Sequence, residues 1–240
     1  MTNSKINNIL KKGRTFENKD GYLDFIKKSP LKNDDTKKVA SFYEEEPFPN
    51  YDNVFNRSQL EATANKTKFP KAISDLIKPK FNILELGCGT GQLTNYLGLK
   101  PNINMVGIDI SKKSLSLAQT FKRKASITNT TFCRADIFDM PFKDSSFDII
   151  IANGVLHHTF NTWEALANAS KMLSENGIII LGLYNKYGRL RTNFLRKISN
   201  FVGKTVLTKI DPVVKKLKTN DRMSQSWIND QYFHPLERSH

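Results

Sequence analysis

The stretch that decides the fold reads Asn82-Ile83-Leu84-Glu85-Leu86-Gly87-Cys88-Gly89-Thr90-Gly91-Gln92-Leu93. Its first half is an apolar run of the length expected for a buried parallel strand. Glycines at alternate positions then break the strand, and helical character resumes from Gln92 to Leu97. A strand, a glycine-rich turn and a helix make a nucleotide-binding βα corner, because residues without a Cβ let a ligand lie against the backbone.

Four more apolar segments follow the glycine loop and repeat the strand pattern. They cover residues 104–109, 131–134, 147–154 and 178–184, with helix-like stretches between most of them. Because right-handed crossovers bring the carboxyl ends of parallel strands to one edge, the ligand-facing loops should meet there. The pattern predicts an α/β fold with a doubly wound, Rossmann-like, mostly parallel sheet and helices on both faces.

The second strand ends in a carboxylate. Asp109 lies 18 residues after Gly91 (109 − 91), near the offset at which an acidic side chain meets a ribose in βαβ sites. A carboxylate suits that task because it accepts hydrogen bonds from both ribose hydroxyls. Asp109 is therefore a candidate ribose ligand; the alternative is an ordinary aspartate at a strand end.

The glycine spacing resembles that of one family. Gly87, Gly89 and Gly91 read G-x-G-x-G after the acidic Glu85, whereas dinucleotide sites read G-x-G-x-x-G. In this the chain resembles the class I S-adenosylmethionine-dependent methyltransferases. The resemblance implies that the glycines support the methionine portion of the cofactor S-adenosylmethionine and that Asp136 contacts its adenine. The cofactor-binding residues that it implies are Glu85, Gly87, Cys88, Gly89, Gly91, Asp109, Ile110, Asp136, Ile137 and Asn153.

The segment after the fourth strand indicates the class of acceptor. It reads Val155-Leu156-His157-His158 and lacks the Asn/Asp-Pro-Pro-Tyr/Phe that is common in methyltransferases acting on base amino groups. It looks like the small-molecule branch of the family, which includes the quinone-biosynthesis methyltransferases. A histidine near the methyl group can serve as a general base, or it can merely cap a helix or pack under the cofactor. The candidate catalytic residues are His157, His158 and Tyr184.

Aromatic residues precede the core in a stiff segment. Pro47-Phe48-Pro49 forces an extended path between Tyr43 and Tyr51. The segment resembles a lead segment found before the glycine motif in a subset of bacterial methyltransferases. By that resemblance Tyr43 and Tyr51 border the cofactor or substrate pocket; alternatively, Phe48 and Tyr51 only pin the segment to the core.

The chain after the fifth strand is basic and helical. Tyr187, Arg189 and Arg191 lead into an amphipathic helix that we regard as a candidate substrate cap. The two arginines could clamp a carboxylate or phosphate, or they could extend along an ordinary amphipathic helix. Related methyltransferases end their sheet with a β-hairpin, and none is readable here. The pattern therefore indicates a truncated chain whose final hairpin is missing.

These features divide the chain into three segments. Residues 1–56 would form an N-terminal arm and aromatic lid, residues 57–184 the S-adenosylmethionine-binding core, and residues 185–240 the basic helical substrate cap. Within the first segment, residues 1–35 have weak apolar periodicity and predict a loosely packed arm or short surface helices.

The composition narrows the function classes. The net charge is +14, of which residues 1–40 carry +5, residues 41–184 +1 and residues 185–240 +8. Basic flanks can attract nucleic acid, anionic lipid or an acidic substrate, or they can reflect a lysine-rich bias with solvated faces. No apolar run approaches the ~20 residues of a membrane span. The two cysteines and four histidines show no metal-ligand spacing, so we expect a cytoplasmic protein without a metal.

The leading hypothesis is methyl transfer from S-adenosylmethionine to an O, N or C nucleophile of a small molecule. An RNA or protein acceptor held by the basic flanks is an alternative, with nucleic acid not favoured. A third class is a non-catalytic adenosyl-ligand module whose basic arm binds a partner or membrane. An NAD-dependent oxidoreductase fits poorly, because the only Tyr-x-x-x-Lys, Tyr96 to Lys100, directly follows the glycine loop. The oligomeric state is left open.

Overall fold

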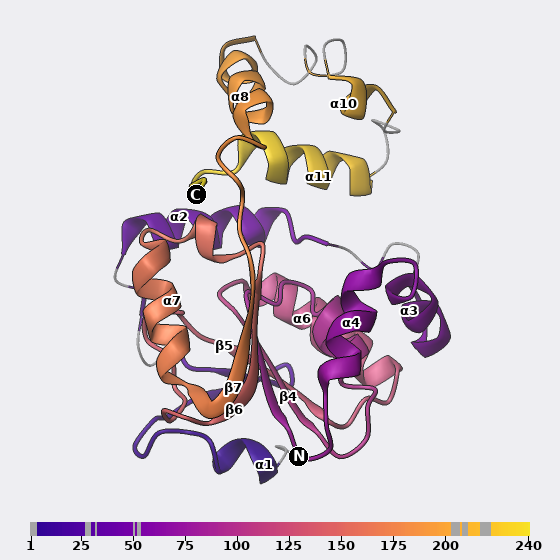
Figure 1. Cartoon of the computed structure of the whole chain (residues 1–240), viewed down its shortest axis with the longest axis vertical. Coiled ribbons are helices and arrows are strands. Elements are labelled where there is room, and N and C mark those ends of the chain that lie inside the picture. The colour runs from indigo at the N-terminus through magenta and orange to yellow at the C-terminus, as the bar shows by residue number, and fades with distance from the viewer. Residues whose placement is uncertain are drawn as a thin grey trace.

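A parallel sheet forms the centre of the protein. The computed structural model describes residues 4–26, 30–31, 33–49, 51, 54–202, 207, 211–216 and 222–240. Its sheet has seven strands and stands edge-on between two layers of helices (Figure 1). The five core strands are β3 (Asn82–Leu86), β4 (Asn104–Asp109), β5 (Thr130–Arg134), β6 (Phe147–Asn153) and β7 (Leu173–Gly182). All neighbours among them pair in parallel, which confirms the predicted α/β, Rossmann-like, mostly parallel fold.

The N-terminal segment adds two strands to one edge of this sheet. β1 (Glu17–Lys19) and β2 (Tyr22–Asp24) form an antiparallel hairpin, and β2 pairs in parallel with β5 through Leu23 and Cys133. The strand order is β1-β2-β5-β4-β3-β6-β7. The expectation of a loosely packed arm or short surface helices over residues 1–35 is therefore wrong for this hairpin, because all three residues of β2 are buried. Three residues are too few for a periodicity to reveal a strand.

The two faces of the sheet carry separate apolar cores. Successive residues of a strand point to opposite faces, so Leu86 packs with α7 (Thr162–Lys171) on one face. Ile83 packs with α4 (Lys68–Leu76) and α5 (Gln92–Leu97) on the other, and Figure 1 shows α7 and α4 on opposite sides of the sheet. The other elements are α1 (Ser4–Asn7), α2 (Asp34–Glu45), α3 (Arg57–Ala64), α6 (Lys112–Lys124) and the 3-10 turn η1 (Leu156–His158).

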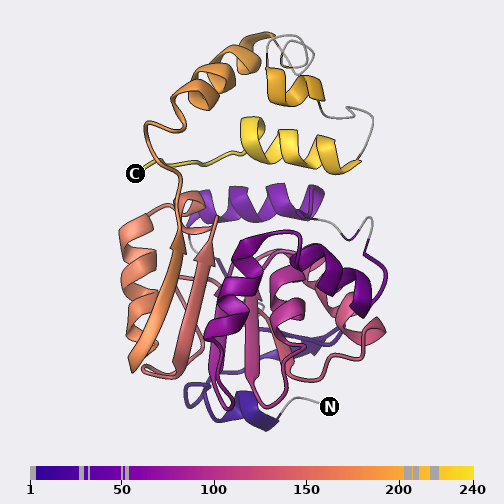
Figure 2. The same cartoon turned by 45° about the vertical axis from the view of Figure 1, so that its right-hand side comes forward.

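The C-terminal segment forms a helical layer of its own. α8 (Leu190–Val202), α10 (Pro212–Lys216) and α11 (Arg222–Phe233) lie beyond the carboxyl edge of the sheet. Helix α2 lies between them and the sheet (Figure 2). We call this layer, with the tail that follows it, the cap. Its own small core contains Leu195, Leu207, Val214, Ile228 and Tyr232.

The end of the chain returns to the sheet. The amide of His240 donates to the carbonyl of Tyr184, and the amide of Lys186 donates to the carbonyl of His240, both at 2.9 Å. No strand follows β7 within the described ranges, and its Ile178 and Leu181 are 42% and 39% exposed. In the same ranges, no helix is long and apolar enough to cross a membrane.

We predict that the N-terminal hairpin contributes to stability as part of the core. Leu23→Ala should lower the free energy of unfolding by about 3 kcal/mol, because it removes methyl groups from a side chain that is 2% exposed. Asn18→Ala, at the exposed position paired with Leu23, should change it by less than about 0.5 kcal/mol. Urea unfolding followed by circular dichroism checks both values. Equal effects of the two substitutions would contradict a structural role for the hairpin.

Candidate functional site

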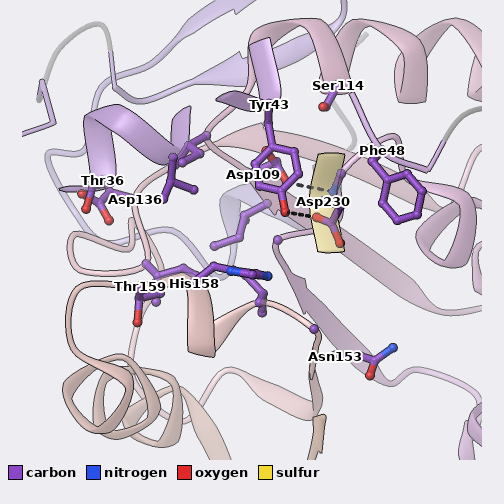
Figure 3. A pocket seen from close by; sticks show the side chains of 18 of the residues that line it. Thr36, Tyr43, Phe48, Asp109, Ser114, Asp136, Asn153, His158, Thr159 and Asp230 are labelled. Carbon is purple, nitrogen blue, oxygen red and sulfur yellow. Dashed lines mark hydrogen bonds between the residues drawn. The ribbon is translucent and has the colours of Figure 1, made fainter. Parts of the chain in front are cut away.

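A cavity of about 370 Å³ lies at the carboxyl edge of the sheet, between the core strands, α2 and α11 (Figure 3). This is the edge where doubly wound sheets bind their ligands. Of the residues predicted from the sequence, the cavity is lined by Tyr43, Gly87, Gly89, Asp109, Ile110, Asp136, Ile137, Asn153, His158 and Tyr184. The residues predicted but lying outside the lining are Tyr51, Glu85, Cys88, Gly91, His157, Tyr187, Arg189 and Arg191.

The glycine loop after β3 is a close-fitting cradle. Gly87, Gly89 and Gly91 have φ values of +60°, +52° and +74°, which side-chain-bearing residues rarely adopt. A Cβ on Gly89 would lie 2.7 Å from the carbonyl oxygen of Phe48, and a Cβ on Gly87 would lie 2.3 Å from Val155. Both the backbone conformation and the space therefore require glycine here, and Gly87 and Gly89 expose backbone to the cavity.

Asp109 fixes the loop to the end of β4. Its Oδ2 accepts a hydrogen bond from the amide of Gly89 at 2.8 Å, and its Oδ1 accepts one from the amide of Ser111 at 2.9 Å. Burial raises the pKa of Asp109, and these two amides oppose that rise. Each oxygen has further lone-pair capacity. A glycine cradle beside a fixed carboxylate fits a nucleoside with two ribose hydroxyls.

Glu85 and Cys88 support the loop from behind. Glu85 is buried and accepts a hydrogen bond from the Thr94 hydroxyl. Burial raises the pKa of Glu85 to about 8, although the bond from Thr94 lowers it. The amide of Cys88 donates to the carbonyl of Ile108 at 2.9 Å, and burial raises the pKa of the Cys88 thiol well above its ordinary value. The structure thus places these two residues beneath the cradle.

A second carboxylate follows β5 along the same edge. Asp136 lines the cavity, and its Oδ1 accepts a hydrogen bond from the amide of Phe138 at 3.0 Å. Burial raises the pKa of Asp136. Ile110 and Ile137 add apolar wall on the same side, and the exposed Asn153 lies at the end of β6.

Three imidazole rings lie above the ends of β6 and β7. The Nδ1 atom of His158 lies 2.7 Å from the carbonyl oxygen of Leu236, so Nδ1 carries the ring proton. His158 also lies against His234, with ring centres 3.8 Å apart, and His157 stacks on Tyr184 at 3.9 Å. Burial lowers the pKa of all three rings, to about 3 for His157 and about 2 for His234. These rings are therefore neutral at pH 7.

The predicted substrate residues have different positions. The hydroxyl of Tyr43 donates to Asp230 at 2.8 Å inside the cavity. Tyr51 stacks on Phe121 at 4.3 Å, away from the cavity, and Tyr187 is 77% exposed. Neither Tyr51 nor Tyr187 lines the cavity. Contacts of these two residues with a substrate therefore stay predictions.

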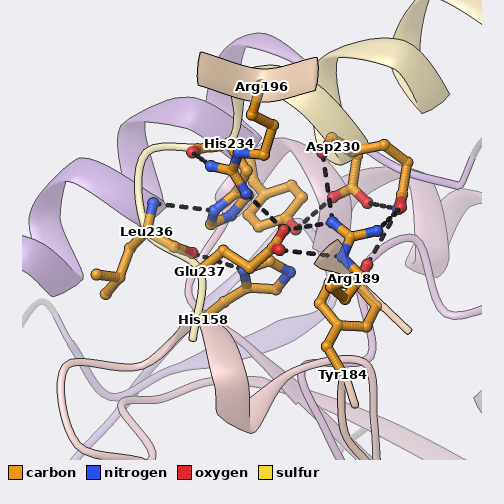
Figure 4. A network of polar contacts seen from close by, with 10 residues as sticks. His158, Tyr184, Arg189, Arg196, Asp230, His234, Leu236 and Glu237 are labelled. Atoms are coloured by element: carbon orange, nitrogen blue, oxygen red, sulfur yellow. Dashed lines mark hydrogen bonds and ion pairs between the residues drawn. The ribbon is translucent and has the colours of Figure 1, made fainter. Parts of the chain in front are cut away.

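Arg189 and Arg191 have carboxylate partners within the cap. Arg189 forms an ion pair with Glu237 at 2.6 Å. Glu237 also forms an ion pair with Arg196 at 2.6 Å (Figure 4). Arg191 pairs with Asp211 at 3.2 Å. The guanidinium of Arg189 also covers the outer face of Tyr184, 4.0 Å from the ring centre. The clamp predicted for the two arginines stays a prediction, and their observed contacts hold the cap together.

Several residues of α11 and α2 that line the cavity were not predicted from the sequence. We call the side formed by α11 the roof of the cavity. Trp227, Asp230 and Gln231 line it from α11, where spacings of three and four residues put side chains on one helix face. Thr36 and Val39 line it from α2. The Asp230-Gln231-Tyr232 run was the sequence feature that could have indicated these residues. It does not show which of its side chains point into the cavity.

We predict that the buried imidazoles lower stability in acid. A folded-state pKa below the ordinary 6.5 means that the unfolded chain binds protons that the folded chain does not, so stability is lost as pH falls below about 6.5. His157→Phe should reduce the slope of the free energy of unfolding against pH by up to about 1.4 kcal/mol per pH unit. Urea unfolding of both proteins from pH 4 to pH 8 measures the two slopes. Parallel curves would contradict a buried neutral His157.

Comparison with known proteins identifies the family. Residues 77–229, more than half of the chain, match the family described as "Methyltransferase domain". The chain is 31% identical over 101 residues to the 27-O-demethylrifamycin SV methyltransferase of Amycolatopsis mediterranei, covering 42% of this chain and 37% of that one. It is 28% identical over 138 residues to the malonyl-[acyl-carrier protein] O-methyltransferase of Bacillus cereus, covering 54% and 50%. The chain thus spans half or less of the length of these relatives.

A solved structure supports the fold. PKMT2 from Rickettsia typhi, in complex with AdoHcy, aligns with a TM-score of 0.57 over 80% of this chain and 42% of that chain. The identity is 19%, so the likeness concerns the fold alone. Together with the family match, the sheet, the glycine cradle and Asp109 lead to one conclusion. The chain belongs to the methyltransferase domain family, whose cofactor is S-adenosylmethionine.

Proposed function

We propose that this protein transfers a methyl group from S-adenosylmethionine to a small-molecule acceptor. The observation that carries the proposal is the Asp109 carboxylate, fixed by the Gly89 amide at 2.8 Å beside a glycine cradle in the wall of the cavity. Gly87 and Gly89 expose backbone to the cavity, where a ligand can lie against it. The family match supports the same activity.

The donor would occupy the half of the cavity that the strand ends form. Gly87 and Gly89 would hold its methionine portion, Asp109 its ribose hydroxyls and Asp136 the adenine amino group, with Ile137 against the adenine ring. Glu85 would act indirectly, through the loop that it supports from below. When bound, the donor supplies a methyl group on a sulfonium, which is already activated for transfer.

The remaining task of the protein is to place the acceptor and exclude water. His158 and Tyr184 line the cavity at the ends of β6 and β7, where they would face the acceptor. Because the Leu236 carbonyl holds the proton on Nδ1 of His158, the lone pair lies on Nε2. That nitrogen could take a proton from an acceptor. His157 would position Tyr184 through their stacked rings.

The named relatives support a small or carrier-bound acceptor. One is named for a rifamycin and the other for malonyl-[acyl-carrier protein]. The Val155-Leu156-His157-His158 segment, which resembles the quinone-biosynthesis branch, agrees with a small molecule. The cavity of about 370 Å³ suits that class as well.

We predict that Asp109 decides donor affinity. Titration calorimetry should show binding of both S-adenosylmethionine and S-adenosylhomocysteine to the wild-type chain. Asp109→Asn should weaken both at least about tenfold, since an amide cannot accept from the Gly89 and Ser111 amides and two hydroxyls as well. Asp144→Asn, at an exposed position outside the cavity, is the matched control and should bind as the wild type does. A folded wild-type chain that binds neither ligand would overturn the proposal.

A further inference from the structure

The cavity has a charge opposite to that of the chain. The protein carries a net charge of +14. Yet the described residues that line the cavity include three aspartates, Asp109, Asp136 and Asp230, and no lysine or arginine. Such a lining attracts cations and repels anions. A phosphate or carboxylate would find no cationic partner among these residues.

The three aspartates come from two different parts of the molecule. Asp109 and Asp136 follow core strands, where the proposed function assigns them to the donor. Asp230 lies on α11 in the cap and is 6% exposed. Trp227 and Gln231 line the cavity from the same face of that helix. Asp230 is therefore the carboxylate on the α11 side of the cavity. Because the other two aspartates are assigned to the donor, Asp230 is the one available to bind the acceptor.

Asp230 is buried with neutral partners. Its Oδ1 accepts a hydrogen bond from the Tyr43 hydroxyl at 2.8 Å, and its Oδ2 accepts one from the Gln231 side-chain amide at 3.0 Å. The nearby guanidinium of Arg189 is directed instead to Glu237 and to the Gln231 oxygen (Figure 4). A buried carboxylate whose hydrogen-bond donors, here Tyr43 and Gln231, are neutral can form a charge-assisted hydrogen bond with a cationic ligand at this point.

Aromatic rings line the same cavity as Asp230. They are Tyr43, Phe48 and Trp227, of which Figure 3 shows Tyr43 and Phe48. Tyr184 also lines the cavity, but its ring already stacks on His157 and carries the Arg189 guanidinium. The faces of such rings attract an ammonium group, most strongly where water is excluded. A carboxylate that shares a cavity with aromatic rings is the chemistry that recognises an organic ammonium ion.

We propose that Asp230 and the aromatic rings of the cavity bind the ammonium group of the methyl acceptor, so that the acceptor is an amine. Before transfer the ammonium would give one proton to Nε2 of His158, and the nitrogen lone pair that this frees would form the new N–C bond as the C–S bond of the donor breaks. This inference rests on the proposed function, because it assigns the other two aspartates to the donor. It narrows the acceptor from an O, N or C nucleophile to nitrogen. The competing assignment gives Asp230 to the amino group of the donor's methionine portion, and the experiment separates the two.

The test uses three probes of similar size and different charge. Phenethylamine is a cation at pH 7, 2-phenylethanol is neutral and 3-phenylpropionate is an anion. Each is titrated by calorimetry into the wild-type chain saturated with S-adenosylhomocysteine. We expect the amine to bind at least about tenfold more tightly than the alcohol, and the propionate most weakly. An alcohol or propionate that binds as tightly as the amine, or an amine that does not bind, would overturn the proposal.

Two variants locate the effect. Asp230→Asn keeps the shape of the side chain and should abolish the preference for the amine, while S-adenosylhomocysteine affinity stays within about threefold. Tyr43→Phe removes the hydroxyl that binds Asp230 and should retain the preference, since the carboxylate remains. If Asp230→Asn weakens S-adenosylhomocysteine as much as it weakens the amine, Asp230 serves the donor and the proposal fails.

The outcomes stay distinguishable from failure of the proposed function. A wild-type chain that does not bind S-adenosylhomocysteine contradicts the methyltransferase assignment itself, before any amine is added. Thermal unfolding shows whether each variant is folded. If Asp230→Asn does not fold, the comparison of the three probes on the wild-type chain still decides between a cationic and a neutral acceptor.

Discussion

The hydrogen bond from the Gly89 amide to Asp109 is the interaction on which the site depends. It joins the glycine loop after β3 to the end of β4 at 2.8 Å, and thereby sets the two neighbouring strand ends relative to one another. The loop can present this amide because Gly89 has a φ of +52°. The same residue lies against the carbonyl of Phe48, so the loop also contacts the aromatic segment that lines the cavity. The sheet, the glycine loop and the Pro47-Phe48-Pro49 segment thus meet at Gly89.

The roof of the cavity is attached differently from its floor. The apolar cluster of the cap contains only cap residues, and polar contacts connect the roof to α2: Tyr43 binds Asp230 at 2.8 Å, and Ser226 binds Glu46 at 3.3 Å. Within the cap, Glu237 holds two guanidiniums at once, which offsets the cost of burying its charge. The ion pairs thus hold the cap together, whereas hydrogen bonds and the ring contacts of His234 with Phe42 and His158 attach it to the rest of the protein.

The fold could be predicted further than the site. Apolar runs and glycine spacing were sufficient to predict the five core strands, because Leu86 and its neighbours form a continuous buried strand. The hairpin of β1 and β2 was missed because a three-residue strand has no period, and the pairing of β2 with β5 joins segments distant in sequence. Asp109 was identifiable from a local offset. Asp230 was not, because its place in the cavity depends on how the cap packs over α2. The ion pair of Arg189 with Glu237 likewise joins residues that are far apart in the sequence.

The most direct test of this account is a crystal structure of the chain grown with S-adenosylhomocysteine. We expect both ribose hydroxyls within hydrogen-bonding distance of Asp109, and the sulfur facing the part of the cavity that His158, Tyr184 and Asp230 line. The glycine loop should be unchanged, since its shape is already fixed by the Gly89 amide. The ligand bound elsewhere, or bound in this cavity with its ribose away from Asp109, would contradict the account.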